Sequence, residues 1–203
     1  MAGPWRANVA GLRSGESLMW PVLVHTARCL APVSELVSRI ALFADVQNLY
    51  YTVRQGYACH FNYAALWAEL AAQGEIVEAY AYAIDRGDAR QQQFQQILRK
   101  LGFEVKLKPY IQRSDGSAKG DWDVGITIDV LDAAPRVDEV VLASGDGDFA
   151  ILLDKIRASY GVEAVAYGVP GLTAQALMRA ANRYVPIEGS LLLKTAATRS
   201  RFP

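Results

Sequence analysis

The chain has 203 residues, of which 52% are hydrophobic and 21% charged, a balance that allows one globular domain with a buried core. Its 21 basic and 21 acidic residues cancel, which excludes a protein that binds nucleic acid through overall charge, so any such contact must be local. Two cysteines and two histidines are too few for a disulfide framework or a zinc site, and they favour a reducing, cytoplasmic location.

Residues 1–38 show no core-forming pattern and are predicted to be a poorly ordered N-terminal extension. Arg6 and Arg13 precede an apolar run from Leu18 to Val24, an order that secretory signals also have. Pro21 interrupts this run, which is shorter than the ~18 to 20 residues of a membrane helix. We therefore expect neither a signal peptide nor a membrane span here.

Short β-branched or aromatic runs alternate with longer segments of helical period between residues 39 and 189, which is the pattern of βαβ units. Most of the runs are continuously apolar, as is typical of parallel strands covered on both faces. The charged alternation from Glu104 to Lys108 instead indicates a strand near the edge of the sheet. The predicted strands are Ile40 to Ala44, Ile76 to Ile84, Glu104 to Pro109, Glu139 to Ala143 and Val162 to Tyr167.

The helices are expected between these strands. Asn62 and Asp88 are suitable N-caps for the first two, and Gly102 suits the end of the second. Right-handed crossovers would place helices on both sides of the sheet, so the expected fold is α/β, a three-layer α/β/α sandwich with a mainly parallel sheet, followed by a C-terminal tail over residues 190–203. The predicted helices are Tyr63 to Ala72, Ala89 to Leu101, Asp121 to Leu131, Asp148 to Ser159 and Thr173 to Asn182.

Aspartates follow two of the predicted strands, at the edge where open parallel sheets bind ligands. Asp45 comes directly after the first strand, and Asn48 lies about one helical turn further on. Asp146 and Asp148 follow the fourth strand in the segment Ser144-Gly145-Asp146-Gly147-Asp148-Phe149, whose glycines allow a sharp turn. Because Mg²⁺ prefers oxygen ligands, these side chains predict a divalent cation site.

A third acidic segment, Lys119-Gly120-Asp121-Trp122-Asp123-Val124, opens the third helix. Each aspartate taken alone is more simply explained as a helix cap or a turn residue. Three segments that converge on one edge favour a shared cation, because carboxylates brought together repel one another without one. Asp129 lies about 120° around the helix from Asp123, so we expect Asp123 to be the ligand and Asp129 to act indirectly or to be exposed.

The charge changes sign along the middle of the chain. Residues 86–119 carry eight basic and three acidic side chains, a net charge of +5, whereas residues 121–154 carry nine acidic and one basic, a net charge of −8. A basic strip beside an acidic metal site suits phosphodiester cleavage, because the strip would hold the backbone and the metal would meet the phosphate. The alternative is an ordinary solvated surface.

Aromatic residues gather near Asp45. Some of them could stack on unpaired bases. Most are expected in the core, because Tyr63 and Trp67 share a helical face. The set consists of Tyr50, Tyr51, Tyr57, Phe61, Tyr63 and Trp67.

The segment Phe43-Ala44-Asp45-Val46-Gln47-Asn48-Leu49, together with the two acidic segments above, resembles NYN domains of the LabA-like branch, relatives of the PIN nucleases. The resemblance covers about residues 39–188 and implies a PIN-like, Rossmann-like fold and a ribonuclease dependent on Mg²⁺ or Mn²⁺, acting on RNA that we expect to be single-stranded. By this resemblance the metal ligands would be Asp45, Asp123, Asp146 and Asp148, with Asn48 completing the catalytic set. The substrate-binding residues are expected to be Lys108, Arg113, Lys119 and Ser144.

One departure from the family pattern is Val46-Gln47, where a small residue such as glycine often follows the first aspartate, and it would narrow the approach of the substrate. Two other functions remain open. A non-catalytic RNA-binding module would bind RNA without turnover. A phosphohydrolase for small phosphate esters would need a covalent nucleophile or a substrate cap, and the sequence has a signature for neither. No membrane partner is expected, and a homodimer is left open.

Overall fold

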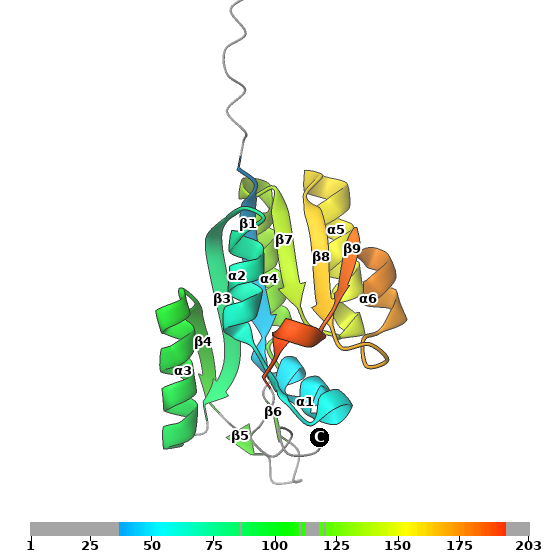
Figure 1. Ribbon diagram of the computed structural model, residues 1–203. Coiled ribbons are helices and arrows are strands. Elements are labelled where there is room, and N and C mark those ends of the chain that lie inside the picture. The colour runs from blue at the N-terminus through cyan, green and yellow to red at the C-terminus, as the bar shows by residue number, and fades with distance from the viewer. Residues whose placement is uncertain (1–36, 86, 110, 113–117, 120, 194–203) are drawn as a thin grey trace, which may run out of the picture. The chain divides into compact units, whose positions relative to one another are not determined.

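The computed structural model describes residues 37–85, 87–109, 111–112, 118–119 and 121–193. Six strands form one sheet in the order β4-β3-β1-β7-β8-β9, and every neighbouring pair is parallel (Figure 1). Because all six run in the same direction, their carboxyl ends share one edge. The strands are β1 (Arg39–Asp45), β3 (Glu75–Asp85), β4 (Glu104–Pro109), β7 (Glu139–Ala143), β8 (Glu163–Gly168) and β9 (Arg183–Pro186).

Helices cover both faces of this sheet, which confirms the predicted three-layer α/β/α fold. Side chains alternate across β1: Ile40 and Leu42 pack in one core cluster, and Ala41 and Phe43 in the other. The first cluster includes residues of α1 (Val46–Tyr57), α2 (Tyr63–Ala71) and α3 (Ala89–Leu101). The second includes residues of α4 (Asp123–Ala133), α5 (Ala150–Tyr160) and α6 (Gln175–Ala180).

Shorter elements complete the description. Two small antiparallel ribbons pair β2 (His60–Phe61) with β10 (Leu192–Leu193), and β5 (Ile111–Gln112) with β6 (Ala118–Lys119). The described residues also form the 3₁₀ turns η1 (Ala134–Arg136), η2 (Gly147–Phe149) and η3 (Gly189–Leu191). In the described parts of the chain, no helix is long and apolar enough to cross a membrane.

Local sequence signals account for several helix ends. Asn62 Oδ1 accepts a hydrogen bond from Ala65 N at 3.1 Å, and Asp88 Oδ1 accepts one from Gln91 N at 2.8 Å, so both predicted N-caps are confirmed. Gly102 follows α3 with a φ of 112°, a conformation that favours glycine. The predicted edge position of β4 is also confirmed, since β4 ends the strand order.

Helix α1 and strand β9 of the domain were not predicted, and neither were the short strands β2, β5, β6 and β10. Helix α1 begins directly after β1 and buries Leu49 and Val53. Strand β9 is a partly exposed edge strand, and an arginine and a proline at its ends hide its apolar pair. The fold also continues into the segment predicted as a tail, because Leu191 is buried and β10 pairs with β2.

Candidate functional site

Asp45 lies where β1 passes into α1. Its carboxylate accepts one hydrogen bond from α1 and one from the residue that follows β7. As the N-cap of α1 it accepts a hydrogen bond from Asn48 N on Oδ1 at 3.0 Å. Its second oxygen, Oδ2, accepts one from Ser144 Oγ at 3.3 Å. The side chain is nearly buried, with 8% of the residue exposed. This carboxylate therefore has a fixed position at the carboxyl edge of the sheet.

The turn after β7 is tied to the start of α1 by a second set of hydrogen bonds. Asn48 Oδ1 accepts from Gly145 N at 2.9 Å, and Ser144 Oγ also accepts from Asp146 N at 3.3 Å. Asp146 Oδ1 in turn accepts from Asp148 N at 3.0 Å and caps η2. Residues that are almost one hundred positions apart in the sequence thus form one connected site, with Asp146 half-buried and Asp148 exposed.

Asp123 enters from the other side of the sheet, as the first residue of α4. The preceding residue anchors the helix start, because Trp122 Nε1 donates to Ala83 O at 2.9 Å and the indole packs on Tyr82 at a centroid distance of 5.3 Å. The indole also lies so close to Gly125 that an added Cβ would be 2.6 Å from the ring. The start of α4 is therefore fixed against the carboxyl end of β3.

The electrostatics show that these carboxylates act on one another. Burial raises the pKa of Asp45 to about 6, and the charges of Asp123 and Asp146 add to the rise, while the hydrogen bonds from Asn48 N and Ser144 oppose it. The pKa of Asp123 is raised first by burial, then by the neighbouring charges of Asp121, Asp146 and Asp148, and Lys108 lowers it. Negative charge therefore accumulates at this edge.

The carboxylates at this edge repel one another without forming a ready coordination shell. Among the described residues, no group of three or more His, Cys, Asp or Glu side chains is arranged to hold a metal ion. Apart from the hydrogen bond from Asp148 N to Asp146 Oδ1, the interactions among Asp45, Asp123, Asp146 and Asp148 are electrostatic in this conformation. Their all-oxygen chemistry still suits a hard cation, and an ion would relieve the repulsion that, after burial, contributes to the two raised pKa values.

Asp129 is neither exposed nor beside the acidic site. It accepts a hydrogen bond from the Tyr82 hydroxyl at 2.7 Å and forms an ion pair with Lys106 Nζ at 2.7 Å. Lys106 also lies over the Tyr80 ring, 4.5 Å from its centroid. This corrects the expectation of an exposed Asp129, because its side chain is half-buried and its partners are on β3 and β4.

Replacing Asp129 with alanine is expected to lower the free energy of unfolding by about 1 to 3 kcal/mol, because it leaves a largely buried hydroxyl and a half-buried ammonium without their partner. Urea denaturation measures the change. Asp132→Ala, an exposed position on the same helix, is the matched control and should change stability little. Equal stability of Asp129→Ala and wild type would contradict this structural role.

The structure describes two of the four predicted substrate-binding side chains. Lys108 Nζ donates to Asp121 O at 2.7 Å and lies over the Trp122 ring, 4.4 Å from its centroid, so it borders the acidic site. Ser144 is fully buried, and its hydroxyl positions Asp45. Arg113 and the side chain of Lys119 lie outside the described residues.

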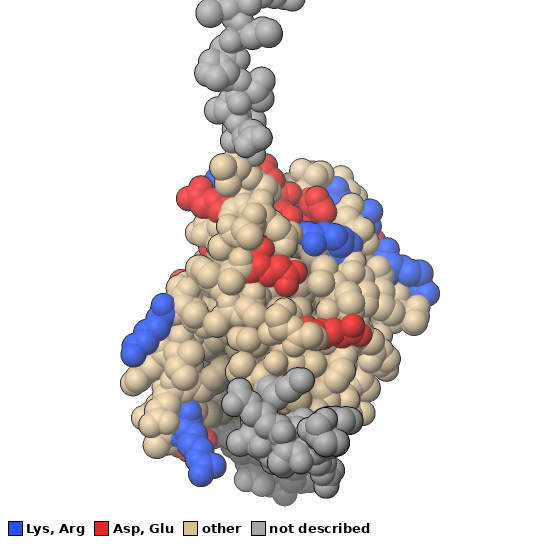
Figure 2. Space-filling model, in the orientation of Figure 1, with Lys and Arg blue, Asp and Glu red and all other residues tan. Residues whose placement is uncertain are grey.

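The predicted basic strip is partly engaged within the protein. Lys106 and Lys108 both have partners on or next to α4. On the face that Figure 2 shows, the described lysines and arginines over α3 are separated from those near β9 and α6 by uncharged and acidic surface. Any binding of a nucleic-acid backbone on this face would therefore depend on a few separate cations.

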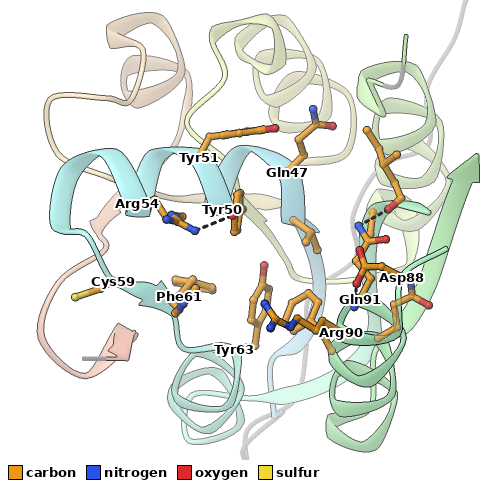
Figure 3. A pocket seen from close by; sticks show the side chains of 16 residues that line it. Gln47, Tyr50, Tyr51, Arg54, Cys59, Phe61, Tyr63, Asp88, Arg90 and Gln91 are labelled. Atoms are coloured by element: carbon orange, nitrogen blue, oxygen red, sulfur yellow. Dashed lines mark hydrogen bonds between the residues drawn. The ribbon is translucent and has the colours of Figure 1, made fainter. Parts of the chain in front are cut away.

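A cavity of about 650 Å³, which the sequence analysis did not predict, is lined by residues of α1, β2, α2, β3 and α3 (Figure 3). Val46 and Gln47, the two residues after Asp45, form part of its wall. The only sequence signal was the aromatic cluster. Of that cluster Phe61 and Tyr63 are buried as expected, whereas Tyr50 and Tyr51 are 46% and 51% exposed at the cavity.

Comparisons with known proteins agree on one family. Residues 39–188 match the family model for the NYN domain. The low amplitude and bright protein LabA of Synechococcus elongatus is 31% identical to this chain over 162 residues, which are 74% of this chain and 84% of LabA. The crystal structure of a protein of unknown function from Vibrio parahaemolyticus is 51% identical, with a TM-score of 0.75, over 79% of this chain and 99% of that protein.

Proposed function

This chain belongs to the NYN domain family, and we propose from that premise that it is a ribonuclease that hydrolyses phosphodiester bonds in single-stranded RNA with the help of Mg²⁺ or Mn²⁺. The observation that carries the proposal is the buried Asp45 carboxylate, whose pKa is raised by burial and by Asp123 and Asp146. A buried carboxylate with two acidic neighbours is stabilised when a cation joins it. Membership of a family related to the PIN nucleases supports the same chemistry.

The ion would be held by Asp45, Asp123, Asp146 and Asp148, and when bound it would supply an activated water and offset the charge of the phosphate. The remaining work falls to the chain itself. Ser144 and Asn48 N keep the Asp45 carboxylate in place at 3.3 and 3.0 Å, which removes the need to order it during the reaction. The Asp45 carboxylate, between the ends of β1 and β7, is therefore preorganised, whereas Asp148 is exposed.

Substrate positioning is proposed for the side chains around this centre. Asn48 uses its carbonyl oxygen to accept from Gly145 N, so its Nδ2 would be the atom that donates to a phosphate oxygen. Lys108, which already lowers the pKa of Asp123, would bring a positive charge next to the backbone of the RNA. Arg113 and Lys119 are proposed to extend this contact along the strand.

The test is cleavage of an end-labelled single-stranded RNA by the full chain after treatment with a chelator. Cleavage should be absent in the chelator and return when excess Mg²⁺ or Mn²⁺ is added. Equal cleavage with and without the chelator would contradict the proposed mechanism. RNA that is bound but stays intact with either ion would instead support the non-catalytic RNA-binding module.

A further inference from the structure

The cavity beside the acidic site is lined largely by aromatic and basic side chains. Tyr50 and Arg54 of α1 lie on one side and face Phe61 and Tyr63 on the other (Figure 3). Its volume of about 650 Å³ is within the ~300 to 1,000 Å³ range typical of small-molecule sites. The cavity is therefore large enough for a ligand of nucleotide size.

Three rings form a rigid apolar floor, which we call the aromatic floor: Phe61, Tyr63 and Phe94. Tyr63 meets Phe61 edge to face at a centroid distance of 4.8 Å and Phe94 at 5.5 Å, so each ring holds the next in place. Tyr50, which is 46% exposed, supplies a ring on the opposite side. The aromatic floor and the Tyr50 ring opposite suit a flat ring that stacks, as a nucleobase does.

The side chain of Gln95, which carries a buried hydrogen-bond donor, belongs to the lining of the same cavity. Gln95 of α3 is only 5% exposed, and its Nε2 is buried with no hydrogen-bond partner among the residues that the structure describes. Buried polar groups in folded proteins are nearly always satisfied, because an unmade hydrogen bond is costly. Because Nε2 has almost no accessible surface, a turn of the Gln95 side chain is needed before it can donate to a ligand in the cavity. Every nucleobase carries a suitable acceptor atom on its edge.

Two arginines give the cavity positive charge. Arg54 is exposed, donates from Nη1 to the Tyr50 hydroxyl at 2.8 Å and lies over that ring, 5.3 Å from its centroid. Arg90 is exposed on α3. The carboxylate in the lining, Asp88, is engaged as the N-cap of α3. Two guanidinium groups beside stacking rings suit the phosphate of a nucleotide.

The cavity adjoins the acidic site through Tyr63 and through the two residues that follow Asp45 in the sequence. Val46 and Gln47 line it directly after Asp45. The pKa of Tyr63 is raised by burial and further by the charge of Asp45, which places the hydroxyl within electrostatic range of that carboxylate. A group bound in the cavity would therefore lie next to the place where the phosphate is proposed to be cut.

We propose that this cavity binds one unpaired nucleotide of the RNA substrate, with its base on the aromatic floor, the base edge on Gln95 and its phosphate between Arg54 and Arg90. The proposal rests on the proposed ribonuclease function and adds a base-binding subsite to it. Such a subsite requires a base that is free to leave its neighbours, which selects single-stranded over paired RNA.

Binding of a short single-stranded RNA, measured in excess chelator so that none is cut, tests the subsite. Gln95→Leu should weaken binding by about 3- to 10-fold, the effect of one hydrogen bond. Its melting temperature should stay equal or rise, because the buried Nε2 has no partner to lose among the described residues. Gln96→Leu, exposed on the same helix, is the matched control and should bind RNA as wild type does.

A second variant tests whether a base stacks on Tyr50. Tyr50→Ala should weaken RNA binding by about 10-fold, since stacking of one base contributes this much. Tyr160→Ala removes an equally exposed tyrosine from α5, on the other face of the sheet, and should have no effect. If Gln95→Leu and Tyr50→Ala both bind RNA as tightly as wild type, the subsite does not exist.

A titration with a free 5′-mononucleotide distinguishes a nucleotide within RNA from a free nucleotide as the ligand of the cavity. Weak or absent binding of the mononucleotide, beside RNA binding that depends on Gln95, supports the RNA subsite. Tighter binding of the mononucleotide than of RNA, lost in Gln95→Leu, would overturn it in favour of a free ligand. Metal-dependent cleavage with no effect of either variant overturns the subsite alone, whereas Gln95-dependent RNA binding without any cleavage supports the subsite and contradicts the proposed hydrolysis.

Discussion

Replacing Asp146 with asparagine is expected to lower the rate of RNA cleavage by at least ~100-fold, since loss of a cation ligand removes several kcal/mol of transition-state stabilisation. The fold should be unaffected. Asparagine keeps an oxygen that can accept from Asp148 N, now 3.0 Å away, so the cap of η2 is preserved. The variant thus removes a charge from the site and little else.

The cleavage rate is measured with saturating Mn²⁺ and compared with Asp132→Asn, which removes the same charge from an exposed position on α4. The control should cleave at nearly the wild-type rate. Equal activity of Asp146→Asn and wild type would show that the carboxylate after β7 has no part in the chemistry.

Asp45→Asn is expected to stabilise the protein at neutral pH in the absence of metal. The pKa of Asp45 is raised to about 6 in the folded protein, from 3.8 for an ordinary aspartate. A carboxyl group with a raised pKa favours the folded state only while it is protonated, so its contribution is full below pH ~4 and is lost as the pH rises through ~6. A shift of about two pH units corresponds to about 3 kcal/mol, and asparagine avoids that loss because it does not ionise.

The measurement is urea denaturation of both proteins in a chelator, from pH 4 to pH 7. The difference in unfolding free energy between variant and wild type should be near zero at pH 4 and reach about 3 kcal/mol in favour of the variant at pH 7. The variant should also cleave RNA as poorly as Asp146→Asn. A pH-independent difference would mean that Asp45 titrates normally, and the site would then lack the unrelieved charge on which metal binding is argued.

Asp45 shows which features of the candidate site could be predicted from the sequence. An aspartate directly after a buried strand lies at the carboxyl edge of a parallel sheet, and this much follows from local pattern and topology. The spacing of Asp45 and Asn48 fits one helical turn, and α1, which was not itself predicted, provides that turn. The bond from Gly145 N to Asn48 Oδ1 was beyond prediction, because it depends on how β1 and β7 lie next to each other in the sheet.

Other features arise only from three-dimensional packing. Asp129 and Asp123 occupy one helix, and only the positions of Tyr82 and Lys106 on neighbouring strands decide that Asp129 is structural. Gln95 lies in a polar run of glutamines that is typical of a solvated helix face, yet it is buried. The cavity is assembled from five separate elements, so no single segment carries a pattern for it.

Crystals of the full chain grown with Mn²⁺ and measured for anomalous scattering test most directly whether the acidic edge is a cation site. A peak should appear within about 2 Å of carboxylate oxygens from at least two of the three acidic segments, those of Asp45, Asp123 and Asp146 with Asp148. Absence of a peak there, at a Mn²⁺ concentration that supports RNA cleavage, would contradict a cation site at this edge.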